Sequence, residues 1–252
     1  MLGFEIHGKG SVHQRSFVDA LKHARDLGLS PATIIDVGAA YGTFTLKCYD
    51  IFPQSRYILI EPLKEYQRYL EKVIRTMTTA EYVLAAANAK RGEITINVHP
   101  DLVGSSVYLE REVSDVNGIP RTVSAETLDH LCEDMKASGP YLIKIDVQGA
   151  ELEVLTGAKG ILNEAEYLIL EVSLFEFFQG GPQLHDVVQY MKSSGFSVYD
   201  IFDLQYRPLD KSLSQVDMAF VRDNGRFRKH HFYATPEQRK EQTERMSKSK
   251  TI

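Results

Sequence analysis

The sequence predicts an α/β fold built on a doubly wound, mostly parallel β-sheet with helices on both of its faces. Short apolar runs of strand length alternate with amphipathic stretches of helical period along most of the 252 residues. This alternation is typical of strands joined by crossover helices. The last two apolar runs, 196–202 and 216–222, break the pattern because only a polar connection joins them. We expect those two strands to pair antiparallel.

Each expected element follows from its own pattern. The first helix, 14–28, has apolar residues at helical spacing and ends at Gly28, and the helix that follows the first strand ends at Pro53. The stretch 63–77 is the most clearly amphipathic. In chain order, the expected strands are 34–37, 56–62, 81–88, 141–147, 165–173, 196–202 and 216–222, and the expected helices are 14–28, 44–52, 63–77, 126–135, 149–162 and 183–195.

We expect three parts along the chain. Residues 1–33 form an N-terminal helical segment, 34–222 form the main domain, and 223–252 form a polar, basic and partly disordered tail. Within the main domain, two strand-like stretches flank a turn at Pro100–Gly104. They predict a β-hairpin insertion near 92–111.

The charge is divided unevenly between the body of the chain and its tail. From Arg222 onward there are nine Lys or Arg and four Asp or Glu, so the net charge of −5 leaves −10 on the body. A body this acidic argues against nucleic-acid binding. Cys48 and Cys132 match no metal-ligand spacing, and two isolated thiols indicate a reducing compartment. Because no apolar stretch has the length of a signal peptide or a transmembrane segment, we expect a cytoplasmic protein.

The most informative stretch is IIDVGAAYGTFTL, residues 34–46, in which a buried strand runs into a turn of small residues. Asp36 precedes this turn, and Gly38 and Gly42 bracket it. Glycines at such a turn let a ligand approach the backbone closely. The next strand ends in Glu61, and an acidic side chain there can accept hydrogen bonds from both hydroxyls of a ribose. Together these features predict an adenosine-type cofactor.

The fingerprint of nicotinamide dinucleotide binding does not fit this turn. Counted from Gly38, it requires glycines where the chain has Ala40 and Thr43. A carboxylate beside the turn would repel a pyrophosphate but attract the ammonium of an amino-acid moiety. S-adenosylmethionine has that ammonium and a ribose but no phosphate, so the residues favour it over a dinucleotide.

Several segments together resemble the FkbM family of S-adenosylmethionine-dependent methyltransferases. They occur in the family's order over about residues 34–222: IIDVGAAYGTFTL, LIEP, AAANAKRGE, GSSV, ETLDHL, YLIKIDVQGAELEVLTGA, LILEVS and QVDMAFVR. The resemblance implies a class I methyltransferase fold, which is Rossmann-like, with seven strands of which the last is antiparallel. It also implies methyl transfer, typically to a hydroxyl of a sugar or another small-molecule acceptor. The family often has Asn where Ala40 stands and Glu where Gln148 stands.

These motifs supply the expected cofactor contacts. Asp36 is expected to bind the ammonium and Glu61 the ribose, and Asn88 stands beside the position at which the family recognises adenine. The full set of expected cofactor-binding residues is Asp36, Gly38, Ala39, Tyr41, Gly42, Phe44, Glu61, Pro62, Asn88, Ser106 and Asp146.

Methylation of an alcohol needs a group that draws away the hydroxyl proton, either a general base or a metal. Asp146, at the end of strand 141–147, is the first candidate for this catalytic base, although it could equally hold the ammonium or a metal. Lys144 shares its strand face and is the second catalytic candidate, which could orient that carboxylate or a substrate oxygen. Glu171 interrupts an apolar strand and needs a polar partner, which the rim of the site would supply. No spacing predicts a metal site, and the dependence on a divalent metal stays open.

Three other interpretations stay open. An enzyme that methylates nucleobase amines would have an Asp/Asn-Pro-Pro-aromatic stretch where this chain has Asp146 to Gly149. A non-catalytic S-adenosylmethionine-binding module would keep the cofactor residues without turnover. A nicotinamide oxidoreductase is disfavoured by the missing glycines. The apolar cluster 174–178 would act either as a lid over the acceptor or as packing beneath a loop.

Overall fold

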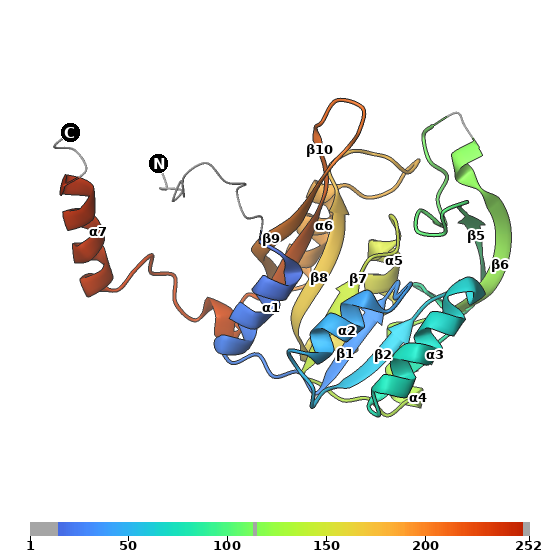
Figure 1. The fold of residues 1–252 in the computed structure, drawn as a ribbon, viewed down its shortest axis with the longest axis horizontal. Coiled ribbons are helices and arrows are strands. Elements are labelled where there is room, and N and C mark those ends of the chain that lie inside the picture. Colours follow the sequence, from blue (N-terminus) through green and yellow to red (C-terminus); the bar gives the residue numbers. More distant parts are fainter. Residues whose placement is uncertain (1–14, 113–114, 249–252) are drawn as a thin grey trace.

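A seven-stranded sheet with helices on both faces forms the centre of the computed structural model, which describes residues 15–112 and 115–248 (Figure 1). Its strand order is β3–β2–β1–β7–β8–β10–β9. The predicted doubly wound α/β fold with seven strands is therefore confirmed. The strands are β1 (Thr33–Val37), β2 (Arg56–Ile60), β3 (Ala80–Val83), β7 (Tyr141–Ile145), β8 (Ala165–Ser173), β9 (Phe196–Tyr206) and β10 (Leu213–Arg222).

The last strand is the antiparallel one, as the sequence predicts. β10 lies between β8 and β9 and pairs antiparallel with both, whereas β3, β2, β1, β7 and β8 pair in parallel. Only the short connection 207–212 separates β9 from β10, which leaves no room for a crossover helix. The register of this pairing sets Asp217 of β10 opposite Glu171 of β8.

Helices cover both faces of the sheet because alternate residues of each strand point to opposite sides. Buried side chains of α1, α2 and α3 share one apolar cluster, and those of α4, α5 and α6 share the other. The bounds are α1 (Phe17–Asp26), α2 (Thr43–Tyr49), α3 (Gln67–Thr76), α4 (Leu128–Asp134), α5 (Glu151–Thr156) and α6 (Leu184–Ser193), with short 3-10 turns at Lys64–Tyr66, Asp115–Asn117, Ile161–Glu164 and Arg226–Arg228.

A second sheet of three strands, in the order β4–β6–β5, stands beside the main one (Figure 1). It contains β4 (Ala86–Ala87), β5 (Gly92–Val98) and β6 (Ile119–Glu126). β5 pairs antiparallel with β6, whereas 105–111, its expected hairpin partner, meets it through the isolated bridge Asn97–Ser106. Most side chains of β6 are exposed or half-buried, so its sequence gives a weak strand signal. The expected strand 81–88 is in fact divided between β3 and β4.

The two ends of the described chain differ in how they meet the body. Ala20, Leu21 and Ala24 of α1 are buried in the core, so the N-terminal helix packs as part of the main fold. In contrast, α7 (Pro236–Lys248) stands apart from the sheet, and its side chains are exposed as far as 247 (Figure 1). The predicted polar tail thus contains a helix, and its partial disorder stays a prediction.

Candidate active site

The glycine turn after β1 is packed against the protein's own backbone. Gly38 has a φ of +75°, and a Cβ atom there would lie 1.9 Å from the carbonyl oxygen of Asp146. Gly42 has a φ of +73°, and its Cβ would lie 2.7 Å from a methyl group of Val73. Both glycines are therefore required by the fold itself, whatever ligand the turn accepts. Between them Ala40 has a φ of +44°, a conformation that Asn tolerates better than Ala.

Glu61 lies at the carboxyl end of β2, where the sequence predicts an acidic cofactor ligand. Its side chain is only 4% exposed, and its two oxygens accept hydrogen bonds from the backbone N–H groups of Ala40 and Leu63, each at 2.9 Å. Burial raises the pKa of Glu61 to about 7 in spite of these two bonds. The carboxylate is fixed in position and retains lone pairs that can accept from ligand hydroxyls.

Asp36 lies beneath the glycine turn and not on the pocket wall. It is 1% exposed and accepts a hydrogen bond from Thr45 Oγ1 at 2.7 Å, and its Oδ1 lies 3.6 Å from Lys144 Nζ. Burial raises the pKa of Asp36, and the charge of Lys144 opposes that effect. These contacts identify a structural ion pair across β1 and β7, where the two residues are direct register partners. The expected contact between Asp36 and a cofactor ammonium stays a prediction.

Lys144 connects Asp36 to Asp146. Its Nζ lies 3.2 Å from Asp146 Oδ2 and donates to the carbonyl oxygen of Gly38 at 3.0 Å. Burial alone would lower the pKa of Lys144, but the carboxylates of Asp146 and Asp36 raise it overall. Lys144 therefore holds the turn and Asp146 together, and its expected part in catalysis stays a prediction.

Asp146 and Gln148 close the other end of the site. Asp146 has a side chain that is 34% exposed, and its Oδ1 accepts a hydrogen bond from Gln148 Nε2 at 3.0 Å. The backbone oxygen of Gln148 in turn accepts from Ser106 Oγ at 2.6 Å. This bond ties the segment after β5 to the loop that follows β7. Ser106 thus helps to build the wall, and its hydroxyl is already engaged.

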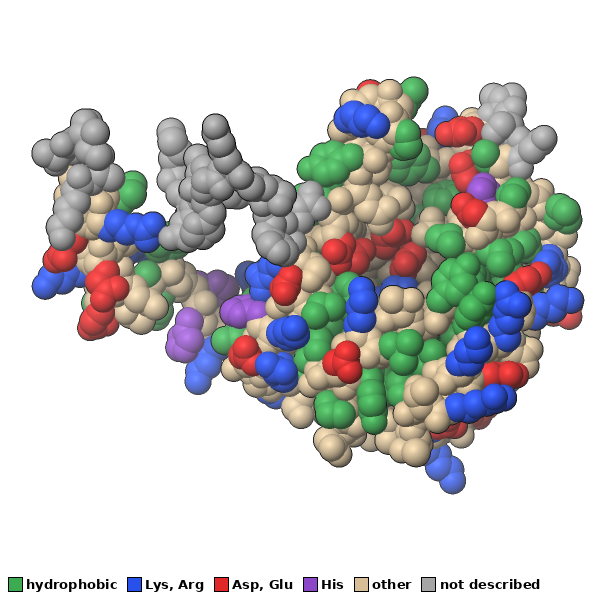
Figure 2. Space-filling view, viewed as in Figure 1, with side chains coloured by type: hydrophobic (Ala, Val, Ile, Leu, Met, Phe, Trp, Pro, Cys, Tyr) green, Lys and Arg blue, Asp and Glu red, His purple; other side chains and the backbone are tan. Residues whose placement is uncertain are grey.

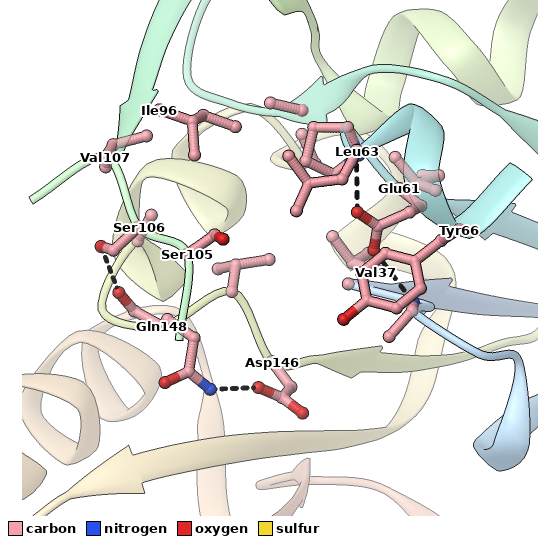
Figure 3. A pocket seen from close by; sticks show the side chains of 18 of the residues that line it. Val37, Glu61, Leu63, Tyr66, Ile96, Ser105, Ser106, Val107, Asp146 and Gln148 are labelled. Atoms are coloured by element: carbon pink, nitrogen blue, oxygen red, sulfur yellow. Dashed lines mark hydrogen bonds between the residues drawn. The ribbon is translucent and has the colours of Figure 1, made fainter. Parts of the chain in front are cut away.

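These residues surround one pocket of about 770 Å³, including its open mouth. Figure 3 shows Glu61 on one side of this pocket, Ser106 and Val107 across from it, and Asp146 on a third side between them. Ile60, Leu63 and Ile96 provide apolar surface. No Lys or Arg occurs among the described residues that line it. An apolar wall with two carboxylates suits a ligand with a flat apolar part and cationic or hydroxyl groups, and it suits a phosphate poorly.

The structure brings together about half of the predicted cofactor residues. Gly38, Glu61, Pro62, Asn88, Ser106 and Asp146 line the pocket. The other five do not: Asp36 and Ala39 are buried, Gly42 is the N-cap residue of α2, Phe44 packs against Phe17 at a tilt, and Tyr41 meets Tyr66 and Tyr69 edge-to-face. Their role in cofactor binding stays a prediction.

Sequence reasoning missed the glutamines around Glu171. Gln148, Gln205 and Gln215 all donate to this carboxylate, each at 2.9 Å. They come from a loop and two strands that are far apart in sequence, so no local pattern reveals the set. Glu151, by contrast, is buried and accepts from the backbone N–H groups of Val147 and Gly149, which makes it a structural residue of the loop after β7.

Residues 15–112 and 115–248 hold neither a metal-binding cluster nor a membrane-spanning helix. No group of three or more His, Cys, Asp or Glu side chains there could hold a metal ion. No helix in the same ranges is both long and apolar enough to span a bilayer. The dependence on a divalent metal therefore stays open, and the cytoplasmic location stays a prediction.

Comparison with known proteins gives a consistent result. A model of the methyltransferase FkbM domain matches residues 36–198, well over half of the chain. The chain is similar to 2-O-methyltransferase NoeI of Sinorhizobium fredii, with 23% identity over 174 residues that cover 64% of this chain and 71% of NoeI. It is similar to Methyltransferase 1 of Beauveria bassiana, with 22% identity covering 74% of this chain and 80% of that protein. Hexuronic acid methyltransferase AglP of Haloferax volcanii is 25% identical over 54% of each chain.

Proposed function

Because the chain belongs to the FkbM methyltransferase family, as its motifs predict, we propose that it transfers a methyl group from S-adenosylmethionine to a hydroxyl oxygen of a saccharide or similar small molecule. The observation that supports this cofactor best is the pocket itself. Glu61 and Asp146 line it from two different strand ends, and no cationic side chain lines it in the described part of the chain. That distribution of charge suits a sulfonium nucleoside and opposes a dinucleotide phosphate.

The residues present fit the cofactor at both of its ends. Glu61, fixed by two backbone N–H groups, would accept hydrogen bonds from the ribose hydroxyls. Asp146 and the backbone around Gly38 would receive the amino-acid arm, while Ile60 and Leu63 would contact the base. When bound, the cofactor supplies an electrophilic methyl group, so the chain has only to orient the acceptor and receive one proton.

Two considerations favour a hydroxyl of a saccharide as the acceptor. NoeI and AglP, two of the similar proteins, are by name a 2-O-methyltransferase and a hexuronic acid methyltransferase. At the rim next to Asp146, the half-exposed side chains of Glu171, Gln215 and Asp217 offer several hydrogen-bonding groups. Sugar hydroxyls are recognised by such groups.

A direct test combines binding with product analysis. Isothermal titration should show binding of S-adenosylmethionine and S-adenosylhomocysteine but not of NAD. Incubation with S-adenosylmethionine and a panel of neutral hexosides, hexuronic acids, amino sugars and simple amines should then give a product methylated on oxygen, identified by mass spectrometry and NMR. Binding without transfer to any hydroxyl would instead support a non-catalytic module, and methylation on nitrogen would make the enzyme an N-methyltransferase.

A further inference from the structure

Glu171 occupies a strand position at which an apolar residue would cost less free energy to bury. Its neighbours on the same face of β8, Tyr167 and Ile169, are buried in the core, whereas Glu171 is partly exposed. It therefore lies where the helical cover of this face ends, at the carboxyl rim of the sheet. Its register partner on β10 is another carboxylate, Asp217, and like charges directly opposite each other destabilise a sheet.

Three carboxamides fix this carboxylate in one orientation. Gln205 Nε2 donates to Oε1, and Gln148 Nε2 and Gln215 Nε2 both donate to Oε2. All three partners are neutral, so the charge of Glu171 is oriented without being cancelled. Asp146 is different, because Lys144 Nζ lies 3.2 Å from its Oδ2 atom and forms an ion pair with it.

Gln148 connects Glu171 to the cofactor pocket. The same Nε2 atom donates to Asp146 Oδ1 at 3.0 Å and to Glu171 Oε2 at 2.9 Å, so one nitrogen separates the two carboxylates. Gln148 itself lines the pocket. Figure 2 shows Asp and Glu side chains gathered in a hollow that lies between the strand pair β9–β10 and the small sheet that contains β5 and β6. Glu171 is thus adjacent to the side of the pocket that Asp146 and Gln148 form.

We propose that Glu171 is the general base that takes the proton from the acceptor hydroxyl, and that Gln148, Gln205 and Gln215 position it. This inference rests on the proposed methyl transfer. As the acceptor oxygen forms its bond to the methyl carbon, its proton passes to a Glu171 oxygen. The electron pair of the breaking carbon–sulfur bond stays on sulfur, and Glu171 later releases the proton to water. Asp146, paired with Lys144, positions the cofactor.

The surroundings of Glu171 also strengthen its affinity for a proton. Burial raises the pKa of Glu171 well above its ordinary value, and the carboxylates of Asp146, Asp217 and Glu151 raise it further, against the opposing charge of Lys144. A base whose pKa approaches the working pH is the most effective one. The group therefore suits the proton transfer that its position allows.

The test replaces Glu171 with Gln, which keeps the volume of the side chain. We expect Glu171→Gln to bind S-adenosylhomocysteine within about two-fold of the unmodified protein and to lose about 100-fold or more in methyl transfer. Glu166→Gln is the matched control, because it makes the same change at the other end of β8, where Glu166 pairs with Arg226. Gln205→Ala, at an exposed position, should lower turnover by about ten-fold and shift its pH profile with cofactor affinity unchanged.

A second measurement does not depend on activity. Because the native state keeps the Glu171 proton to a higher pH than the unfolded chain does, this residue makes the protein less stable as pH rises through that range. Chemical denaturation at a series of pH values should therefore show the unmodified protein losing stability relative to Glu171→Gln as pH rises above the ordinary pKa of a glutamate. The unmodified protein should show no such loss relative to Glu166→Gln.

The outcomes separate the two proposals. If the unmodified protein methylates a hydroxyl and Glu171→Gln does so equally well, Glu171 is not the base, although the methyltransferase assignment stands. An unchanged pH dependence of stability would also overturn the proposal. If the unmodified protein transfers no methyl group to any acceptor, the proposed function fails first.

Discussion

The two ends of the candidate site are built in different ways. The proposed cofactor end consists of the glycine turn after β1 and Glu61 after β2, where backbone N–H groups and close backbone contacts fix the geometry. The proposed acceptor end consists of side chains from β8, β9, β10 and the loop after β7, which converge on Glu171. Backbone contacts define the cofactor end, so it should tolerate few substitutions. Side-chain amides define the acceptor end, so its residues should be easier to replace without unfolding the protein.

The largest expected effect tests the backbone-defined end. Gly38→Ala would place a Cβ atom 1.9 Å from the Asp146 carbonyl oxygen, so we expect a loss of more than about 4 kcal/mol in the free energy of unfolding. Gly195→Ala is the control, because its φ is +83° and no atom lies within 4 Å of the added Cβ. It should cost about 1–2 kcal/mol by conformation alone. Equal losses in urea denaturation would show that close packing at Gly38 does not matter.

The next effect distinguishes a structural carboxylate from a binding one. Asp36→Asn removes the charge that faces Lys144 inside the protein, and we expect it to lower the free energy of unfolding by about 3 kcal/mol. Affinity for S-adenosylhomocysteine, measured under conditions in which the variant is folded, should change by less than about three-fold. The reason is that Asp36 does not line the pocket. A large loss of affinity in a stably folded variant would instead support the contact between Asp36 and the cofactor ammonium that the sequence predicts.

Glu61 should show the reverse behaviour. Glu61→Gln removes a charge-assisted acceptor from the pocket, so S-adenosylhomocysteine should bind about ten-fold or more weakly by isothermal titration. Since the pKa of Glu61 is about 7, the carboxylate is protonated below that pH and accepts hydrogen bonds less well. Affinity of the unmodified protein should therefore fall as pH decreases from 8 to 6. The variant should bind with little pH dependence, and a parallel fall in both would exclude this role.

The smallest effect concerns the tie between the two ends. Ser106→Ala removes the hydrogen bond to the backbone oxygen of Gln148, and we expect a loss of about 1 kcal/mol in the free energy of unfolding. Cofactor affinity should change little, because the wall formed by Ile96 and Val107 remains. If methyl transfer fell strongly while stability held, Ser106 would have to contact a reacting group.

The same contrast explains what the sequence could predict. The doubly wound sheet, the antiparallel pairing of the last two strands and the positions of Glu61 and Asp146 at strand ends follow from local periodicity and from motifs within single segments. Asp36 was expected on the ligand because its spacing to Gly38 is local, but its partner Lys144 is 108 positions later and becomes visible only through strand register. The glutamines around Glu171 could not be predicted for the same reason, because they come from segments that are far apart in the sequence. No pattern within one segment records which side chains meet across β8, β9 and β10.

The placement of β10 between β8 and β9 has a consequence for how the enzyme is completed during synthesis. A nascent chain that ends before Leu213 has every residue of the nucleoside end but leaves one edge of β8 unpaired and open to other chains. It also lacks Gln215, so the carboxylate at Glu171 would lose one of its amide supports. Chains truncated before Leu213 should therefore be prone to aggregation and should lack methyltransferase activity.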